Sequence, residues 1–169
     1  NNLISEKWVS GTANASQYQS TELNLRTNID FGQNNSDGTC SENHNFLPFL
    51  GKTFNGQYKT ISNLCRVDKG TMRNKPTASP SGVGLFGEIS GKTVKYLKIS
   101  NVRFSVADKD ANGNPASTDA GDYQAVGALA PKIANSEVID VQLNDIVIQA
   151  PLAGGLAGYI EGSTISGVT

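Results

Sequence analysis

The chain has 169 residues, which is the length of a single domain, and Gly is plentiful while aromatic residues make up only 7%. This composition favours many short strands joined by tight turns over a helix bundle. The formal net charge of −1 gives no sign of a nucleic-acid partner, and no apolar run approaches the roughly 20 residues of a transmembrane segment.

Residues 1–20 contain Trp8 and a few aliphatic residues, and we predict that they form a cap over the open end of a stack of strands. The chain begins at Asn1 with neither an initiator Met nor an apolar signal segment. We therefore expect a mature chain or an excised fragment.

Residues 21–81 are predicted to hold the first strands of the stack. Apolar residues alternate near the start of this range, as they do in a strand that is half-buried on a core. They are Leu23, Leu25, Ile29 and Phe31. Further along, Ile61 and Leu64 have the spacing of Val94 and Leu97, so we expect these two pairs to occupy equivalent positions.

Two cysteines, Cys40 and Cys65, leave two interpretations open. One is a disulfide that closes a loop of 25 residues and contributes roughly 3 kcal/mol by restricting the unfolded chain. The other is a pair of free, buried thiols. Loops rich in Asn and Gly suit an exported protein, which favours the disulfide.

Residues 82–169 contain three repeats that align without a gap: GVGLFGEISGKTV, VGALAPKIANSEV and AGGLAGYIEGSTI, beginning at Gly82, Val126 and Ala153. Their apolar positions coincide. The matching sets include Leu85, Leu129 and Leu156; Ile89, Ile133 and Ile160; Val94, Val138 and Ile165; Leu97, Val141 and Val168; Ile99 and Leu143; Val102 and Ile146; and Phe104 and Ile148.

The spacing of the repeats predicts the architecture. The second and third repeats are 27 residues apart and the first and second 44, so the 17 extra residues form an insertion between Phe104 and Val126. Short apolar runs that repeat in register predict an all-β, right-handed parallel β-helix, in which each repeat buries its apolar face on the next. The hairpins of a β-sandwich are the alternative. The third repeat stops at Thr169, so we expect a single β-helix domain over 1–169 that is a fragment of a longer protein.

The insertion contains DKDANGNPASTD, which places oxygen-bearing side chains at calcium-loop spacing. The candidate ligands are Asp108, Asp110, Asn112 and Asp119, with Asp122 nearby. Strand-like residues flank this segment where an EF-hand has helices, and Pro115 stands where an apolar residue is usual. Calcium binding and a metal-free, turn-rich loop both stay open.

The segments ELNLRTNIDF, FLGKTFNGQYKTISNL and VGLFGEISGKTVKYLKISNV resemble bacterial GLUG-motif proteins over about Thr21 to Thr169. The resemblance implies a pectin-lyase-like β-helix in an exported or surface-anchored bacterial protein. It carries no catalytic residue set. The middle repeat departs from the motif at Ala130 and Pro131.

No catalytic grouping is visible in the sequence. His44 is the single histidine, and no Ser/His/Asp or Cys/His arrangement accompanies it. A basic stripe of Lys92, Lys95, Lys98 and Arg103 suits either an acidic glycan or plain solvent exposure. Tyr58, Tyr123 and Tyr159 could stack on sugars or pack in turns.

We therefore predict a secreted or cell-surface bacterial module that is not an enzyme. Its function would be adhesion or surface display, with a glycan or a host cell-surface protein as the partner. The contacts are expected on projecting loops at Val67–Ser81 and Ala107–Gln124. The alternatives are part of a carbohydrate-active β-helix enzyme, either a polysaccharide lyase or a hydrolase, and a purely structural spacer.

Overall fold

A computed structural model describes residues 21–42, 44, 49, 51–68, 82–106, 125–150 and 152–169. These residues form thirteen strands and no helix. The strands are β1 (Glu22–Asn24), β2 (Ile29–Asp30), β3 (Thr53–Asn55), β4 (Thr60–Asp68), β5 (Gly82–Val83), β6 (Ile89–Ser90), β7 (Thr93–Val106), β8 (Ala125–Gly127), β9 (Ala130–Ala134), β10 (Glu137–Gln149), β11 (Leu152–Gly154), β12 (Ala157–Glu161) and β13 (Thr164–Ser166).

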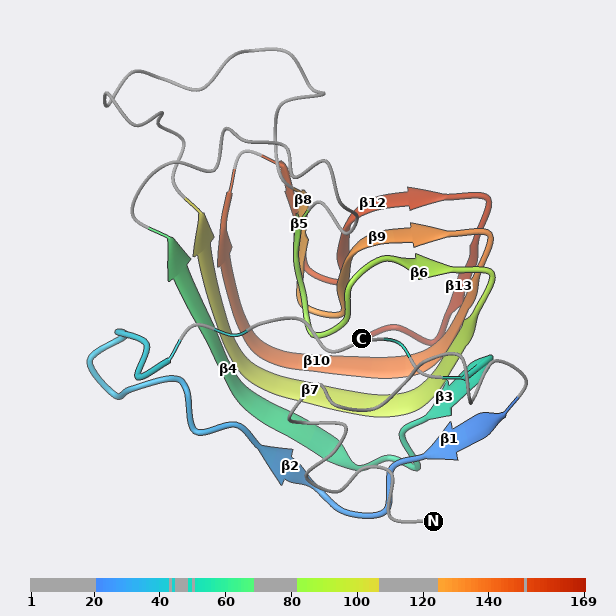
Figure 1. Ribbon diagram of the computed structural model, residues 1–169, viewed down its shortest axis with the longest axis horizontal. Helices are drawn as coiled ribbons and strands as arrows, with labels where there is room; N and C mark the ends of the chain where they lie inside the picture. The colour runs from blue at the N-terminus through green and yellow to red at the C-terminus, as the bar shows by residue number, and fades with distance from the viewer. Residues whose placement is uncertain are drawn as a thin grey trace.

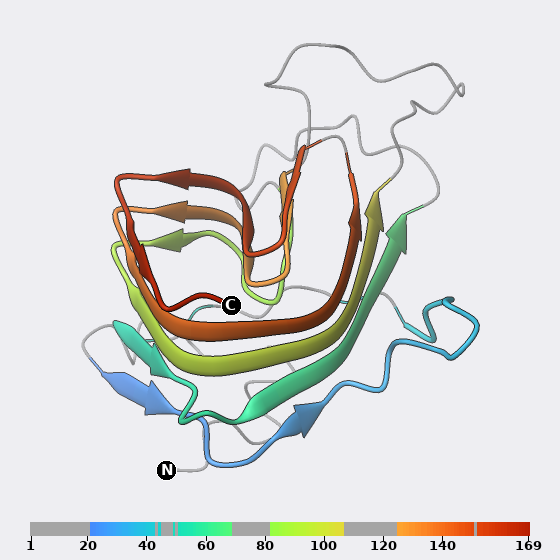
Figure 2. The same cartoon turned by 180° about the vertical axis from the view of Figure 1, so that it is seen from behind.

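The strands form three sheets, and all pairings between them are parallel. The large sheet joins β1, β3, β7, β10 and β13, with β4 between β2 and β7; the two smaller sheets are β5–β8–β11 and β6–β9–β12. In Figure 1 the long strands β4, β7 and β10 are nested arcs, and Figure 2 shows the same stacking from behind. The prediction of an all-β fold with parallel strands is confirmed, and the alternative of antiparallel hairpins in a β-sandwich is wrong.

From residue 82 onward the chain visits the three sheets in the same order three times. We call each passage a rung: β5–β6–β7, then β8–β9–β10, then β11–β12–β13. Residues 1–20, predicted as a cap, lie outside the described residues, as do 69–81 and 107–124, which contain nearly all of the two predicted contact loops. The part of the chain that the structure describes has no long apolar helix of the kind that crosses a membrane.

The predicted register is confirmed for most of the repeat. Ile89 pairs with Ile133 and Val94 with Val138, and the agreement continues along β7 and β10 to the pair of Phe104 and Ile148. The gapless alignment is wrong at its start, because Val83 pairs with Val126 where the sequence had matched Gly82. The first rung is one residue shorter between β5 and β6. At this corner a Cβ on Gly84 would lie 2.6 Å from Ala130 Cα, so the tight turn needs glycine.

The expected equivalence of Ile61 and Leu64 with Val94 and Leu97 is also wrong. Ile61 pairs with Ile99 and Leu64 with Val102, while Phe54 of β3 takes the place beside Val94. A turn at Gln57 and Tyr58 separates β3 from β4 and shifts the register, which spacing alone does not reveal.

The long strands bend at residues with positive φ. In β7 these are Tyr96 and Asn101, and the neighbouring positions in β10 are Asp140 and Asp145. Each bend interrupts the alternation of buried and exposed side chains, which is why the sequence shows two short apolar runs, Val94 to Ile99 and Val102 to Phe104, where β7 is one strand of 14 residues. The inward side chains stack from rung to rung into a continuous apolar core.

Candidate functional site

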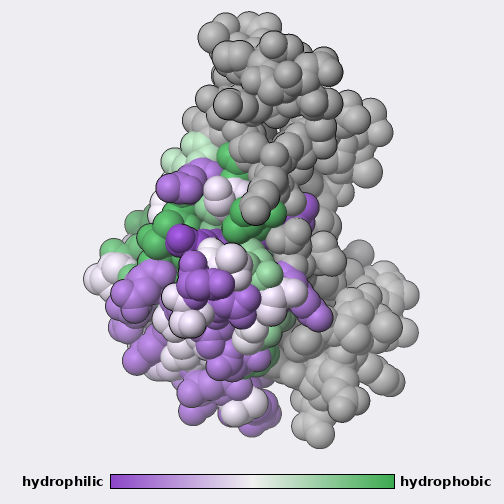
Figure 3. All heavy atoms as spheres, turned by 90° about the vertical axis from the view of Figure 1, so that its left-hand side faces the viewer, coloured by the Kyte–Doolittle hydropathy of each residue, from purple (hydrophilic) through white to green (hydrophobic). Residues whose placement is uncertain are grey.

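A groove lies on the outer face of the large sheet, beside the loop that follows β2. It consists of two adjoining hollows of about 570 and 200 Å3, which share Gly38, Arg103 and Val147. We call their union the outer groove. Its lining is Asn34, Asn35, Ser36, Asp37, Gly38, Val67, Asn101, Val102, Arg103, Phe104, Ser105, Asp145, Val147 and Gln149. Figure 3 shows that hydrophilic side chains cover much of the described surface on this side of the molecule.

The groove lies along two rows of outward-facing residues on neighbouring strands, and Asn101, Arg103, Asp145 and Val147 of these rows line it. One row consists of Cys65, Arg103 and Val147, which are register partners in β4, β7 and β10. A second row lies two residues earlier, at the bends, and consists of Asn63, Asn101 and Asp145. Parallel in-register pairing therefore brings side chains from residues 63 to 147 into one surface.

The loop of residues 31–42 forms the wall of the groove. The disulfide between Cys40 and Cys65 holds it against β4, with Cα atoms 5.4 Å apart. Within the loop, the backbone N–H of Asn35 donates to Thr39 O at 2.9 Å, and that of Gly38 donates to Asn35 O at 3.0 Å. The disulfide prediction is confirmed, and its consequence is a braced wall beside the strand surface.

Asp37 stabilises the tip of this loop. Its Oδ1 accepts hydrogen bonds from the Thr39 hydroxyl at 2.6 Å and the Thr39 backbone N–H at 2.9 Å. These two bonds lower the pKa of Asp37. The carboxylate is therefore ionised at neutral pH and engaged within the loop.

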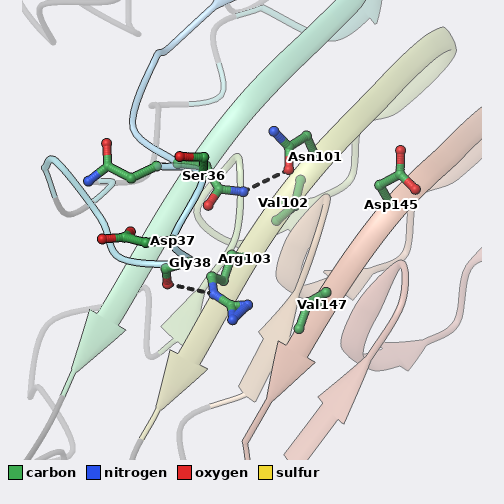
Figure 4. A pocket seen from close by; sticks show the side chains of 10 residues that line it. Ser36, Asp37, Gly38, Asn101, Val102, Arg103, Asp145 and Val147 are labelled. Carbon is green, nitrogen blue, oxygen red and sulfur yellow. Dashed lines mark hydrogen bonds between the residues drawn. The ribbon is translucent and has the colours of Figure 1, made fainter.

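Arg103 occupies the boundary between the two hollows. Its Nε donates to Gly38 O at 2.7 Å. Gly38 has a φ of 79°, and a Cβ at this position would lie only 2.8 Å from Arg103 Nη2. The two terminal nitrogens of Arg103 make no hydrogen bond to any residue in the described ranges. Figure 4 shows the guanidinium between Gly38 and Val147. It is therefore fixed in direction while its fork of donors remains available.

A chain of amide side chains runs across the other end of the groove. Asn34 Nδ2 donates to Asn101 Oδ1 at 2.7 Å, Asn101 Nδ2 donates to Asn63 Oδ1, and Asn63 Nδ2 donates to Asp30 Oδ1 at 2.6 Å. Asp145 is the next residue in this row, and its carboxylate has no hydrogen bond or ion pair within the described ranges. The groove thus offers one fixed cation, a row of amides and one free carboxylate.

The predicted basic stripe does not form one positive surface. Lys95 is paired with Glu22 at 3.0 Å, and Lys92 Nζ donates to Gly51 O at 2.8 Å. The Lys98 ammonium makes no bond to the described residues. Of the four basic residues, only Arg103 lines the groove.

His44 is a core residue. It is 1% exposed, its Nε2 lies 3.3 Å from Leu85 O, and its ring packs between Phe31 and Phe104, with centroids 5.2 and 6.2 Å away. Burial lowers the pKa of His44 to about 4, so the imidazole is neutral at pH 7.

The candidate calcium ligands Asp108, Asp110, Asn112 and Asp119 lie outside the described residues, as does Asp122, and calcium binding stays a prediction. Within the described ranges no three His, Cys, Asp or Glu side chains gather in a metal-binding arrangement.

Sequence reasoning missed the groove because it assigned no binding role to Asp145 and did not bring it together with Asn34–Gly38. The sequence held part of the signal, because the Cys40–Cys65 pairing was readable from it. The predicted register, however, sets Cys65 beside Lys98, and the observed register of β4 and β7 is needed to place the loop before Cys40 beside Arg103.

No family model, no curated protein and no solved structure matches this chain.

Proposed function

We propose that the chain is a right-handed parallel β-helix module of an exported bacterial surface protein of the GLUG-motif kind, and that it binds an acidic glycan in its outer groove without catalysis. The repeated order in which the chain visits three parallel sheets supports the β-helix. The disulfide supports export, because such bonds persist in oxidising compartments.

The observation that carries the binding function is the fixed guanidinium of Arg103. The Gly38 carbonyl directs it, and the disulfide-bound loop holds that carbonyl in place. A preorganised donor fork loses little side-chain freedom on binding, and guanidinium groups match carboxylates in a bidentate arrangement.

The other groups of the groove suit the hydroxyls of a sugar. The amides of Asn34 and Asn101 can donate and accept hydrogen bonds along this surface, and the carboxylate of Asp145 can accept them. Ser105 and Gln149 continue it beyond Arg103, with Ser105 Oγ donating to Gln149 Oε1 at 3.4 Å. The groove follows β7 from Asn101 to Ser105, and this distance of four residues corresponds to about 13 Å of strand. An extended chain of sugars therefore fits the groove better than a compact metabolite.

Titration with oligogalacturonate, followed by calorimetry, tests the proposal. We expect Arg103→Ala to weaken binding about 10- to 100-fold, since a charge-assisted hydrogen bond contributes about 1.5–3 kcal/mol. Arg103→Lys keeps the charge but loses the fork and should recover only part of the affinity. Lys98→Ala is the matched control, because it removes a positive charge from β7 outside the groove.

Asp145→Asn gives a second, opposite test. It removes a negative charge that repels an acidic ligand and extends the row of amides from Asn63 and Asn101. We expect about two- to five-fold tighter binding, and the wild-type affinity should fall with added salt. Equal binding by wild type, Arg103→Ala and Lys98→Ala would contradict the proposed site.

The competing functions give different results in the same experiments. Release of unsaturated or reducing sugar from uronate polymers would show an enzyme. Binding to host-protein arrays but not to acidic glycans would show a protein adhesin, with the loops at Val67–Ser81 and Ala107–Gln124 as the predicted contacts. The absence of binding and of activity in every assay would favour a structural spacer. Calorimetric titration with Ca2+ tests the insertion separately.

A further inference from the structure

Two tyrosines stack on the outer surface at the bend of β7, away from the outer groove. Tyr58 belongs to the turn between β3 and β4, and Tyr96 lies in β7. Their ring centroids are 5.2 Å apart with an interplanar angle of 29°. Tyr58 is 50% exposed and is the most exposed large hydrophobic side chain in the described part of the chain.

Hydrogen bonds at both ends hold Tyr58 across the ring of Tyr96. Its backbone N–H donates to Tyr96 O at 2.6 Å, and its hydroxyl donates to Asp140 Oδ2 at 3.0 Å. Asp140 is the register neighbour of Tyr96 in the next rung, so the Tyr58 side chain spans the Tyr96 position to reach it. One face of the Tyr58 ring is thus backed by Tyr96, and the other is open to solvent.

The backbone at these rings adopts a conformation that tyrosine disfavours. Gln57 and Tyr58 have φ values of 49° and 57°, and the N–H of Lys59 donates to Gly56 O at 2.8 Å, which closes a tight turn. Asn-Gly is the usual occupant of such a turn. Tyr96 also has a positive φ, of 56°.

The fold itself does not require aromatic residues at these positions. In the third rung Gly167 occupies the place equivalent to Asp140 and Tyr96, with a φ of 63°. Neither tyrosine contributes to the apolar core. Residues held in costly conformations at an exposed surface are typical of ligand sites, where the position of a side chain matters more than stability.

The surroundings of the rings point to a neutral ligand with polar edges. Lys95 Nζ lies 5.9 Å from the centroid of the Tyr96 ring and is paired with Glu22 at 3.0 Å, so a cation already lies beside the ring that backs Tyr58. The Asp140 carboxylate, which accepts from the Tyr58 hydroxyl, repels an anionic ligand. Gln57 and Asp140 border Tyr58 with hydrogen-bonding groups. The single open ring face is far smaller than a stable protein interface.

We propose that the exposed face of Tyr58, backed by Tyr96 and flanked by Asp140 and Gln57, binds the apolar face of a neutral pyranose ring. The slightly positive C–H groups of a sugar face complement the negative face of the tyrosine ring, and its hydroxyls reach the polar side chains at the edge. This site is separate from the outer groove and does not depend on Arg103.

Titration with neutral hexasaccharides of glucose, mannose and xylose, monitored by NMR, tests this proposal. We expect at least one to bind, Tyr58→Ala to weaken that binding at least ten-fold, and Tyr58→Phe to weaken it less, because the ring remains while its bond to Asp140 is lost. Tyr159→Ala is the control. Tyr159 is 48% exposed, its hydroxyl donates to Glu161 Oε2 at 3.1 Å, and Lys132 Nζ lies 5.8 Å from its ring centroid, but no second ring from the described residues backs it.

Tyr58→Gly separates binding from folding. Glycine suits the positive φ at this position, so the variant should keep or raise the melting temperature while it loses sugar binding. Arg103→Ala should leave this binding unchanged. The proposal is wrong if no neutral hexasaccharide binds the wild type, if Tyr58→Gly binds as well as wild type, or if choline binds at the rings and sugars do not.

Discussion

The inner and outer faces of the large sheet follow different rules. Inside, positions in register carry similar side chains, as in Ile61, Ile99 and Leu143. Outside, the row at Cys65 continues with Arg103 and then Val147, three residues with unrelated chemistry. Each inward residue packs against the next rung, which restricts its type. An outward residue meets solvent or a loop and is free to differ, so the repeated pattern of the fold lies on the inner face and the proposed binding sites lie on the outer face.

The largest effect on the free energy of unfolding is expected from the substitution of an inward-facing residue. Phe104 is fully buried, so Phe104→Ala should lower the free energy of unfolding by about 3–5 kcal/mol, through lost burial and the cavity that remains. Lys98→Ala on the outer face of the same strand should change it by no more than about 0.5 kcal/mol. Urea unfolding of both variants measures the contrast, and similar losses would refute it.

Replacing both cysteines with serine tests an outward position that has a structural role. Cys65 faces outward but is fully buried, because the disulfide binds the loop over it. We expect the free energy of unfolding to fall by roughly 3 kcal/mol, because the unfolded chain is no longer restricted by a bond across a separation of 25 residues. We also expect a lower affinity for oligogalacturonate. Unchanged affinity in the folded double variant would show that the loop does not need the disulfide to form the wall.

His44 brings a pH dependence into the core. Its pKa is about 4 in the folded chain, against an ordinary value of 6.5, so the unfolded chain binds a proton that the folded chain does not. This contribution to stability is complete above about pH 6.5, falls as the pH decreases toward 4, and then levels off. The total loss is at most about 3 kcal/mol. Urea unfolding across this range should show a clearly smaller slope for His44→Phe, and an unchanged slope would assign the effect to other groups.

The smallest effect is expected at the bend of β7. Asn101 has a φ of 51° and bonds Asn34 and Asn63 through its side chain. Asn101→Ala removes the side-chain hydrogen bonds and disfavours the positive φ, so it should lower the free energy of unfolding by about 1–2 kcal/mol. Asn101→Gly also removes the hydrogen bonds but tolerates the positive φ, so it should lower the free energy of unfolding by less. Thermal melts of the pair separate backbone strain from side-chain bonding, and equal melting temperatures would show that the strain is negligible.

The sequence predicted the inner face well because burial imposes a repeated apolar pattern that is readable without coordinates. Val94 with Val138 and Ile89 with Ile133 are examples. It failed where the chain gains or loses residues locally. The corner near Gly84 is one residue shorter than its counterpart. The segment from Phe54 to Ile61 is two residues longer than the segment from Val94 to Ile99. A periodic pattern does not report such small insertions and deletions.

The candidate sites were less predictable, because they depend on contacts between distant segments. Arg103 was recognisable as basic, but its partner Gly38 is 65 residues away and reaches it only through the disulfide-bound loop. Similarly, Tyr58 was identifiable as a surface aromatic, whereas its stacking on Tyr96 follows from the turn geometry and the pairing of neighbouring strands.

Amide NMR mapping with oligogalacturonate tests the central claim most directly, because it locates the ligand on the surface. The account predicts chemical-shift changes concentrated at Asn34–Gly38, Asn101–Arg103 and Asp145–Val147, with little change at inward-facing positions. Those changes should disappear in Arg103→Ala and persist in Lys98→Ala. No shifts in the wild type, or shifts confined to surfaces away from the groove, would contradict the account.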